Sequence, residues 1–251
     1  MVVTESGIAM SQKREGRLCH LKSSIDLNNN RLLLDFPEME TMSVSLDTMS
    51  QHETEASLCS SKVCGDRVQS YDCGNEVGDW LSEALCRPGC RLIRQATGDN
   101  RVTKLKNDDA EDKSRLSLAN ESQYLLICRD SVTALQQKIL KRREEGDTQD
   151  CFDIDNLVDR FRGNLVVSGC DPFEEESWTS IKIGKLHFKS QGTCTRCQMV
   201  CLDQQTGEKS KEPLKTLAVW RGTKVPFGIH LRGCFSATQP MIRVGDPIFI
   251  S

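Results

Sequence analysis

The part of the sequence from residue 164 to residue 250 most constrains the fold, because strand-like segments follow one another there without regular helical segments between them. The candidate strands are residues 164–167, 178–183, 185–189, 198–202 and 242–250. A doubly wound α/β fold needs a helix between successive parallel strands. The pattern therefore favours a mixed α+β, β-rich fold, in which a β-barrel carries helices on its outside.

The first 60 residues predict a small β module of their own. Strands are expected at residues 1–4, 8–13, 17–21, 25–27 and 31–36, and residues 38–60 are rich in Ser, Thr and Glu, as in a connector. Because a strand begins at Met1, we expect this module to be the truncated end of a small β-barrel. The predicted domains are residues 1–60, the module with its connector, and residues 61–251.

Three helices are expected between these strand-rich parts. Apolar residues of segment 76–85 recur at helical spacing, and they are Val77, Trp80, Leu81, Ala84 and Leu85. Ser131 is the predicted N-cap of a second helix, and residues 153–162 predict a short third one. The polar stretch 97–116 is predicted to be a solvated loop.

Charge and hydropathy exclude several classes of protein. The formal net charge is −3, divided as −5 over residues 1–150 and +2 over residues 151–251, so neither half has the basic excess of a non-specific nucleic-acid binder. No stretch approaches the roughly 18 apolar residues of a membrane span, and residues 1–7 do not resemble a signal peptide. We therefore expect a cytoplasmic protein without nucleic-acid or membrane partners, whose 13 cysteines are thiols.

Three of these thiols, Cys194, Cys197 and Cys201, lie within eight residues. Cys-x-x-Cys spacing is typical of zinc sites, but a structural zinc needs four ligands and no second knuckle with this spacing follows. A thioredoxin-like pair would need a helix after its first cysteine. The alternation of residues 197–202 instead favours a strand whose thiols fill a core.

Arg196 is the residue that favours a chemical role for these thiols over a role as core filler. A guanidinium next to a thiol favours the thiolate and offers two donors to a phosphate. Arg160, Arg162 and Asn164 add two guanidiniums and an amide. One thiolate among such donors indicates an anionic cofactor whose metal prefers sulfur, whereas the four histidines show no metal-ligand spacing.

The order of these motifs resembles the MOSC domain family. The residues that carry the resemblance are residues 160–169, Trp178, residues 194–197, residues 203–207, Phe227-Gly228 and residues 244–247. The run from Arg196 to Gly207 is most similar to the molybdenum cofactor sulfurase branch of the family. Residues 8–36 resemble the small β-barrel module that precedes MOSC domains.

The resemblance implies a Mo-molybdopterin cofactor, with Cys197 as the catalytic thiolate and molybdenum ligand. It further implies a cofactor pocket lined by the following residues: Asn120, Glu121, Ser122, Arg162, Asn164, Thr195, Arg196 and His230. His230 stands where relatives usually carry Tyr.

The resemblance also implies a role in sulfur transfer. A cysteine desulfurase domain with pyridoxal phosphate, or another sulfur donor, would supply sulfur, and xanthine dehydrogenase and aldehyde oxidase would receive the sulfurated cofactor. Nothing in this chain resembles the pyridoxal-phosphate domain, so the chain alone is not expected to desulfurate cysteine. Two alternatives stay open: a molybdenum oxidoreductase similar to the amidoxime-reducing component, and a zinc-stapled binding module.

Overall fold

The computed structural model describes residues 1–47, 58–63, 66–96, 101–102, 115–118, 121–234 and 240–250. The chain divides into two compact units, which are described separately below. The first unit contains Met1–Arg101 and Gln204–Glu208, and the second contains Val102–Asp203 and Lys209–Ser251. The first unit extends to Arg101, beyond the boundary predicted after residue 60, because the residues that follow position 60 continue the sheet of this unit.

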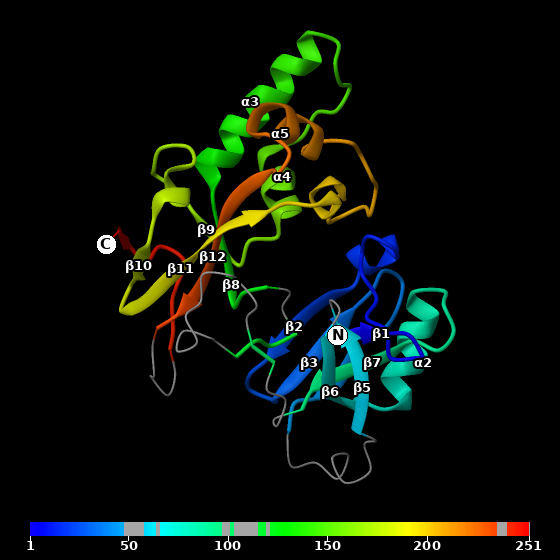
Figure 1. Cartoon of the computed structure of the whole chain (residues 1–251). Helices are drawn as coiled ribbons and strands as arrows, with labels where there is room; N and C mark the ends of the chain where they lie inside the picture. The colour runs from blue at the N-terminus through cyan, green and yellow to red at the C-terminus, as the bar shows by residue number, and fades with distance from the viewer. Residues whose placement is uncertain are drawn as a thin grey trace. The chain divides into compact units, whose positions relative to one another are not determined.

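The first unit contains two sheets (Figure 1). One has the order β1-β7-β6-β5, and its strands are β1 (Val2–Val3), β5 (Leu58–Val63), β6 (Asp66–Asp72) and β7 (Arg91–Gln95). The other is an antiparallel meander of β2 (Lys22–Asp26), β3 (Arg31–Asp35) and β4 (Met42–Ser45). β1 pairs with β7, Val2 with Leu92 and Val3 with Arg91, so strands from distant parts of the unit belong to one sheet.

Helix α2 (Asn75–Ala84) covers the core of this unit. Its apolar face buries Val77, Leu81 and Ala84 against Leu34, Phe36 and Leu92. The helical spacing of the apolar residues predicts this helix and its buried face. Arg91 donates to both carboxylate oxygens of Asp72 at 2.7 Å, which ties β7 to the end of β6.

Two predicted strands of the first unit are wrong. Residues 17–21 do not form a strand: Gly16–Cys19 is the 3-10 helix η1, whose start is capped by the Glu15 side chain at the N–H of Arg17. In segment 8–13 isolated bridges at Ile8 and Ala9, the latter with Val3, replace the expected strand. Strands β5 and β6 were not predicted, because Ser, Cys and Gln interrupt their apolar alternation. Most of the predicted loop 97–116 lies outside the described residues.

The second unit is built on a six-stranded sheet of order β13-β10-β11-β12-β8-β9 (Figure 1). Its strands are β8 (Tyr124–Cys128), β9 (Leu165–Val167), β10 (Ser180–Ile183), β11 (Leu186–Thr195), β12 (Pro226–Gly233) and β13 (Ile248–Ile250). β8 and β9 are parallel, and every other pair is antiparallel. Helices α3 (Arg129–Glu144) and α4 (Ile154–Phe161) form the crossover between β8 and β9, and α5 (Leu214–Arg221) precedes β12.

Strands β8 and β12 of this sheet are buried on both faces. Ile127 packs with Leu135, Phe161 and other apolar residues of the helices, whereas its neighbour Leu126 joins a second cluster that contains Trp178 and Phe188. Alternation of side chains along a strand produces this division.

Gly228 reverses that alternation within β12. Phe227 and Ile229, two residues apart, belong to opposite clusters. Gly228 has φ +73°, and a Cβ there would lie 2.5 Å from the carbonyl oxygen of Leu126, so the position needs glycine. The register of β12 against β11 shifts twice in this region, which indicates a bulge.

Three sequence predictions for this unit need correction. Ser131 does not cap α3: Cys128 is the N-cap, and Ser131 lies inside the helix. Residues 198–202 are not a strand, because Gln198–Cys201 forms the 3-10 helix η4. Of segment 242–250, the strand occupies only Ile248–Ile250, and β12 was missed because its two glycines interrupt the strand pattern.

The mixed α+β, β-rich fold class is confirmed, with a curled six-stranded sheet, peripheral helices and small N-terminal sheets. The third predicted helix is confirmed as α4, and its N-cap is Asp153, whose carboxylate accepts from the N–H groups of Asp155 and Asn156. Among the described residues, no helix has the length and apolar content needed to cross a membrane.

Candidate anion and metal-ligand site

Cys197 lies at the point where β11 ends and η4 begins. It is the N-cap of η4, with extended backbone (φ −128°, ψ −178°), and its side chain is exposed. The preceding residue is still tied to the segment before β12, because the N–H of Arg196 donates to Val225 O at 3.0 Å. The change from strand to 3-10 turn therefore places the thiol outside the core.

The two neighbouring thiols have a different environment. Cys194 and Cys201 are buried, and the Cys201 thiol donates to Lys211 O at 3.4 Å. Burial raises the pKa of Cys194, against the opposing effect of Arg196, and burial also raises the pKa of Cys201. Of the three clustered thiols, Cys197 alone is available to a ligand, and the interpretation as core filler holds for the other two.

The Arg196 guanidinium is held by the protein itself. Its Nη2 donates to Phe161 O and its Nη1 to Cys194 Sγ at 3.2 Å, while the guanidinium carbon lies 5.2 Å from the centre of the Phe161 ring. These contacts bind the segment before Cys197 to the C-terminal end of α4. Arg196 therefore positions the site, and its predicted role as a phosphate donor stays a prediction.

The C-terminal end of α4 carries Arg162 and Asn164. Arg162 is exposed and adopts the left-handed conformation (φ 55°) that ends the helix. At Gly163 a Cβ would lie 2.9 Å from Cγ1 of Ile127, so a larger residue would displace this turn. Asn164 Oδ1 accepts from the N–H of Leu125 at 2.6 Å, which leaves its NH2 group as the donor available to a ligand.

Arg160 does not belong to this donor set, so its prediction as a donor is wrong. It is 4% exposed, and its Nη2 lies 3.0 Å from Asp203 Oδ2. Asn156 completes the network, donating to Asp203 at 2.6 Å and accepting from Arg160 Nε at 2.8 Å. Asp203, two residues after η4, thus anchors α4 beside the turn that starts at Cys197. Sequence reasoning missed this role of Asn156 and Asp203, which their separation of 47 residues hides.

His230 and Glu121 form the other side of the site. His230 pairs with Leu125 across β12 and β8, and its Nε2 lies 3.1 Å from Glu121 Oε2, at an angle outside hydrogen-bond geometry. Burial lowers the pKa of His230; the Glu121 carboxylate opposes this effect, and the Arg196 charge adds to it. At neutral pH His230 is therefore the neutral imidazole.

The remaining predicted residues are placed as follows. Ser122 is buried, with its Oγ 2.6 Å from Gln191 Oε1 and 2.7 Å from Leu231 O, so it holds the loop to the sheet. Thr195 is exposed at the end of β11, where its backbone pairs with Pro226. Asn120 lies outside the described residues.

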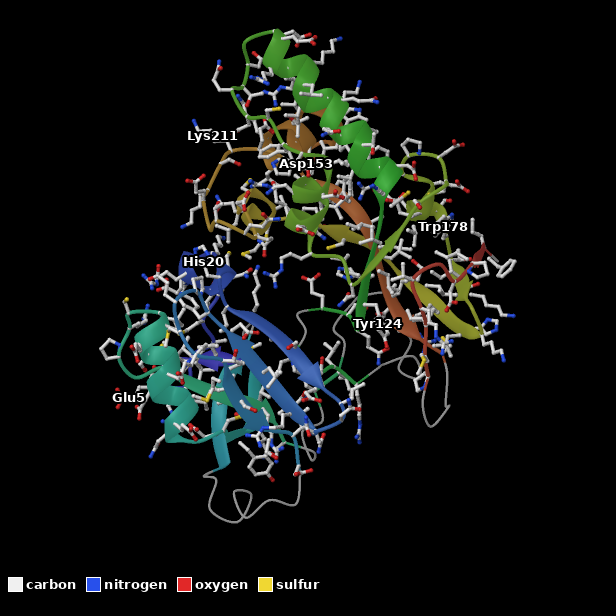
Figure 2. The ribbon with its side chains drawn as sticks, turned by 180° about the vertical axis from the view of Figure 1, so that it is seen from behind. Glu5, His20, Tyr124, Asp153, Trp178 and Lys211 are labelled. Carbon is white, nitrogen blue, oxygen red and sulfur yellow. The ribbon has the colours of Figure 1, made fainter. Side chains whose placement is uncertain are left out.

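A continuous set of contacts connects these groups. Arg196 contacts Phe161, which precedes Arg162; Asn164 binds Leu125, which pairs with His230. Figure 2 labels Asp153 at the start of α4 and Tyr124 at the start of β8, the two elements that carry this path. The arrangement offers an exposed thiol, an exposed guanidinium, an amide donor and a neutral imidazole, a set suited to a soft metal in an anionic ligand.

Comparison with known proteins supports one family. Residues 113–249 match the model of the MOSC domain, and residues 1–88 match that of the MOSC N-terminal beta barrel domain. The Molybdenum cofactor sulfurase of Bombyx mori is 45% identical over 92% of this chain, and that of Homo sapiens is 39% identical over 100%.

These relatives are much longer than the residues they share with this chain. The chain spans 27% of the Bombyx mori protein and 27% of the human protein. The matches therefore establish homology over this region and the domain type. Through the order of its motifs, its β-rich fold and the match over residues 113–249, the chain belongs to the MOSC domain family.

Proposed function

We propose that this chain binds a Mo-molybdopterin cofactor and presents it for sulfuration, as part of a cytoplasmic molybdenum cofactor sulfurase. The observation that carries the proposal is the exposed Cys197 thiol, beside an arginine that ties it to a helix end bearing Arg162 and Asn164. Molybdenum in this cofactor would supply a centre that accepts a sulfur ligand. The homology to proteins named molybdenum cofactor sulfurase supports the same role.

The residues present fit such a group. Thiolate sulfur is polarisable and suits a soft metal. The Cys197 thiol is exposed, whereas the thiols of Cys194 and Cys201 are buried. Arg162 can donate two parallel hydrogen bonds to a phosphate, and the Asn164 amide can donate to a carbonyl or ring nitrogen of a pterin. Arg196 orients Cys197, because its guanidinium and its N–H are both held by neighbouring carbonyl oxygens.

His230 would contribute as a neutral group. An imidazole kept neutral by burial accepts a hydrogen bond at one nitrogen and donates at the other. The Glu121 carboxylate, 3.1 Å from Nε2, would form an ion pair with the ring if the ring became charged. Sulfur would come from a cysteine desulfurase domain bearing pyridoxal phosphate or from another donor, and the recipients would be xanthine dehydrogenase and aldehyde oxidase.

The test measures what the chain retains when it is expressed in cells that make molybdopterin. We expect molybdenum and pterin near one per chain, by elemental analysis and by fluorescence of the oxidised pterin. Cys197→Ala should lose most of the molybdenum without a change in thermal unfolding. Cys151→Ala is the matched control, because Cys151 is also exposed and belongs to the same unit.

Unchanged molybdenum in Cys197→Ala would overturn the ligand assignment. Tightly held zinc without pterin would favour a zinc-stapled module instead. Turnover of an N-hydroxylated substrate with an electron donor would favour the oxidoreductase similar to the amidoxime-reducing component.

A further inference from the structure

Cys128 and Cys170, which lie outside the candidate site, have their sulfur atoms in contact. Cys128 ends β8 and caps α3, while Cys170 lies in the turn after β9, 42 residues further along the chain. The Sγ–Sγ distance is 2.8 Å. A covalent disulfide measures about 2.05 Å, so a small displacement separates this pair from bond formation.

Backbone and side-chain contacts hold the two segments together on either side of the sulfurs. The parallel pairing of β8 with β9 aligns Cys128 with Val167. Asp130 then joins the segments a second time: its Oδ2 accepts from the N–H of Gly169 at 2.8 Å and from the Cys128 thiol at 3.4 Å. The positive φ of Gly169 (+87°) turns the chain so that the next residue faces Cys128. The pair is therefore positioned by the fold.

The two thiols differ in accessibility. Cys128 is fully buried, with 0% exposure, whereas Cys170 is partly exposed. A small oxidant can therefore reach Cys170, and Cys128 is placed to react with the product. Burial raises the pKa of the Cys170 thiol, so its reaction rate should increase with pH.

A metal ion fits this cluster less well. The donor atoms of Cys128, Asp130 and Cys170 lie within 4.8 Å of one another and form a three-ligand group among the described residues. A tetrahedral zinc with Zn–S bonds of about 2.3 Å keeps two sulfur ligands roughly 3.8 Å apart. The two sulfurs at 2.8 Å would have to separate by about 1 Å to hold zinc.

We propose that Cys128 and Cys170 form a reversible intramolecular disulfide, a two-electron oxidation site that is distinct from Cys197. With a low-molecular-weight disulfide such as oxidised glutathione as oxidant, the Cys170 thiolate attacks one of its sulfurs. A mixed disulfide forms and one molecule of thiol leaves. The Cys128 thiolate then attacks the Cys170 sulfur and releases the second thiol. Two protein thiols are oxidised, and one disulfide is reduced to two thiols.

The bond would close a loop that contains α3, α4 and the donor residues Arg162 and Asn164. A cross-link across a loop of this length stabilises a protein mainly by restricting its unfolded chain. We therefore expect the oxidised form to unfold at a temperature higher by roughly 5–10 °C. Hydrogen exchange in α4 should slow in the oxidised form.

The experiment exposes the whole chain to an excess of oxidised over reduced glutathione, blocks the remaining thiols and maps the peptides by mass. We expect a peptide that joins Cys128 to Cys170, together with the rise in unfolding temperature. Cys170→Ser should lose both. Cys151→Ser is the matched control, because Cys151 is an exposed cysteine inside the same loop, and it should keep both.

Recovery of Cys128 and Cys170 as two free thiols after oxidation of the wild-type chain would overturn the proposal. One bound zinc per chain that protects both thiols from oxidation, and that Cys170→Ser loses, would also overturn it. The peptide map of the wild-type chain decides the matter even if a variant fails to fold. Because the assay reads the sulfur–sulfur bond directly, its result does not depend on whether the chain binds a molybdenum cofactor.

Discussion

The second unit contains two groups of cysteines that contrast in sequence and in space. Cys194, Cys197 and Cys201 lie within eight residues, yet they have three different environments: one thiol is exposed, one is held by a guanidinium, and one donates to a backbone carbonyl. Cys128 and Cys170 are 42 residues apart, yet their sulfurs are 2.8 Å apart. Thiols that are close in sequence therefore differ in environment in the first group, whereas strand pairing brings distant thiols into contact in the second.

The difference shows what decides the chemistry of a thiol in this fold. At residues 194–201 the chain changes from strand to 3-10 turn, so side chains that would alternate in a strand point in several directions. At Cys128 and Cys170 the parallel pair β8–β9 brings two strand ends to the same edge. Backbone conformation, rather than spacing, leaves the Cys197 thiol exposed in the first group and brings two sulfurs into contact in the second.

The largest expected effect is on stability, and it concerns the Asp203–Arg160 ion pair that anchors α4 beside the turn at Cys197. Asp203→Ala would leave the buried Arg160 guanidinium without its carboxylate partner, and we expect a loss of about 3–5 kcal/mol in the free energy of unfolding. Chemical denaturation measures this loss. Asp203→Asn keeps an acceptor and should lose less. Equal stability of the alanine variant and the wild type would show that α4 does not depend on this network.

The next effect compares thiol reactivity within the first group. Under native, reducing conditions we expect iodoacetamide to modify Cys197 about 100-fold faster than Cys201, because the Cys201 thiol must first be exposed by local opening. Peptide mass mapping over time measures both rates, with exposed Cys234 as the reference. Similar rates at Cys197 and Cys201 would contradict the difference in environment described above.

A smaller effect concerns the buried acid near the second group. Glu175 is 0% exposed and accepts from Ser131 Oγ at 2.8 Å, and burial raises its pKa above the usual 4.5. Its contribution to stability is therefore complete below pH 4.5 and is lost as the pH rises through the raised pKa. Glu175→Gln should stabilise the protein relative to wild type by the order of 1 kcal/mol at pH 8, and less at pH 4. Denaturation at both values checks this, and a difference that does not change with pH would refute it.

The smallest expected effect is the contribution of His230 to the pH dependence of stability, and its sign is opposite to that of Glu175. Burial lowers its pKa below 6.5, so its contribution is present above pH 6.5 and is lost as the pH falls below that value. The wild type should lose more stability than His230→Gln between pH 7 and pH 5. The difference should be less than about 1 kcal/mol, because Glu121 opposes the lowering of the His230 pKa. Thermal unfolding at the two pH values measures it. An unchanged pH dependence in the variant would exclude His230 as its source.

Local signals predicted the elements that depend on local physics. The apolar spacing of α2 and the apolar run over residues 31–36, which contains β3, each lie within a few residues, and both elements are present. The 3-10 helices η1 and η4 were predicted as strands, because their short apolar runs look alike in either conformation. The side chain of Ser131 suits an N-cap, but its hydroxyl is used by Glu175 and Phe173 inside the helix.

The candidate site was predictable in its residue types and through the resemblance to MOSC domains, but not in its geometry. The exposure of Cys197 and the engagement of Arg196 by Phe161 O depend on contacts between segments that are distant in sequence. The Arg160–Asp203 pair and the Cys128–Cys170 contact join residues 43 and 42 positions apart. No periodicity or spacing within a local window contains information about such contacts.

The strand order of the second unit has a consequence for synthesis of the chain. β12 lies between β11 and β8 in the sheet, although it is translated after both. While the chain is being made, the pair β8–β9 and the pair β10–β11 can form only as separate ribbons with open edges, until Pro226–Gly233 has emerged and joins them. A ribosome that pauses before this strand would hold two incomplete sheets with exposed apolar faces, the state in which a nascent chain most needs a chaperone.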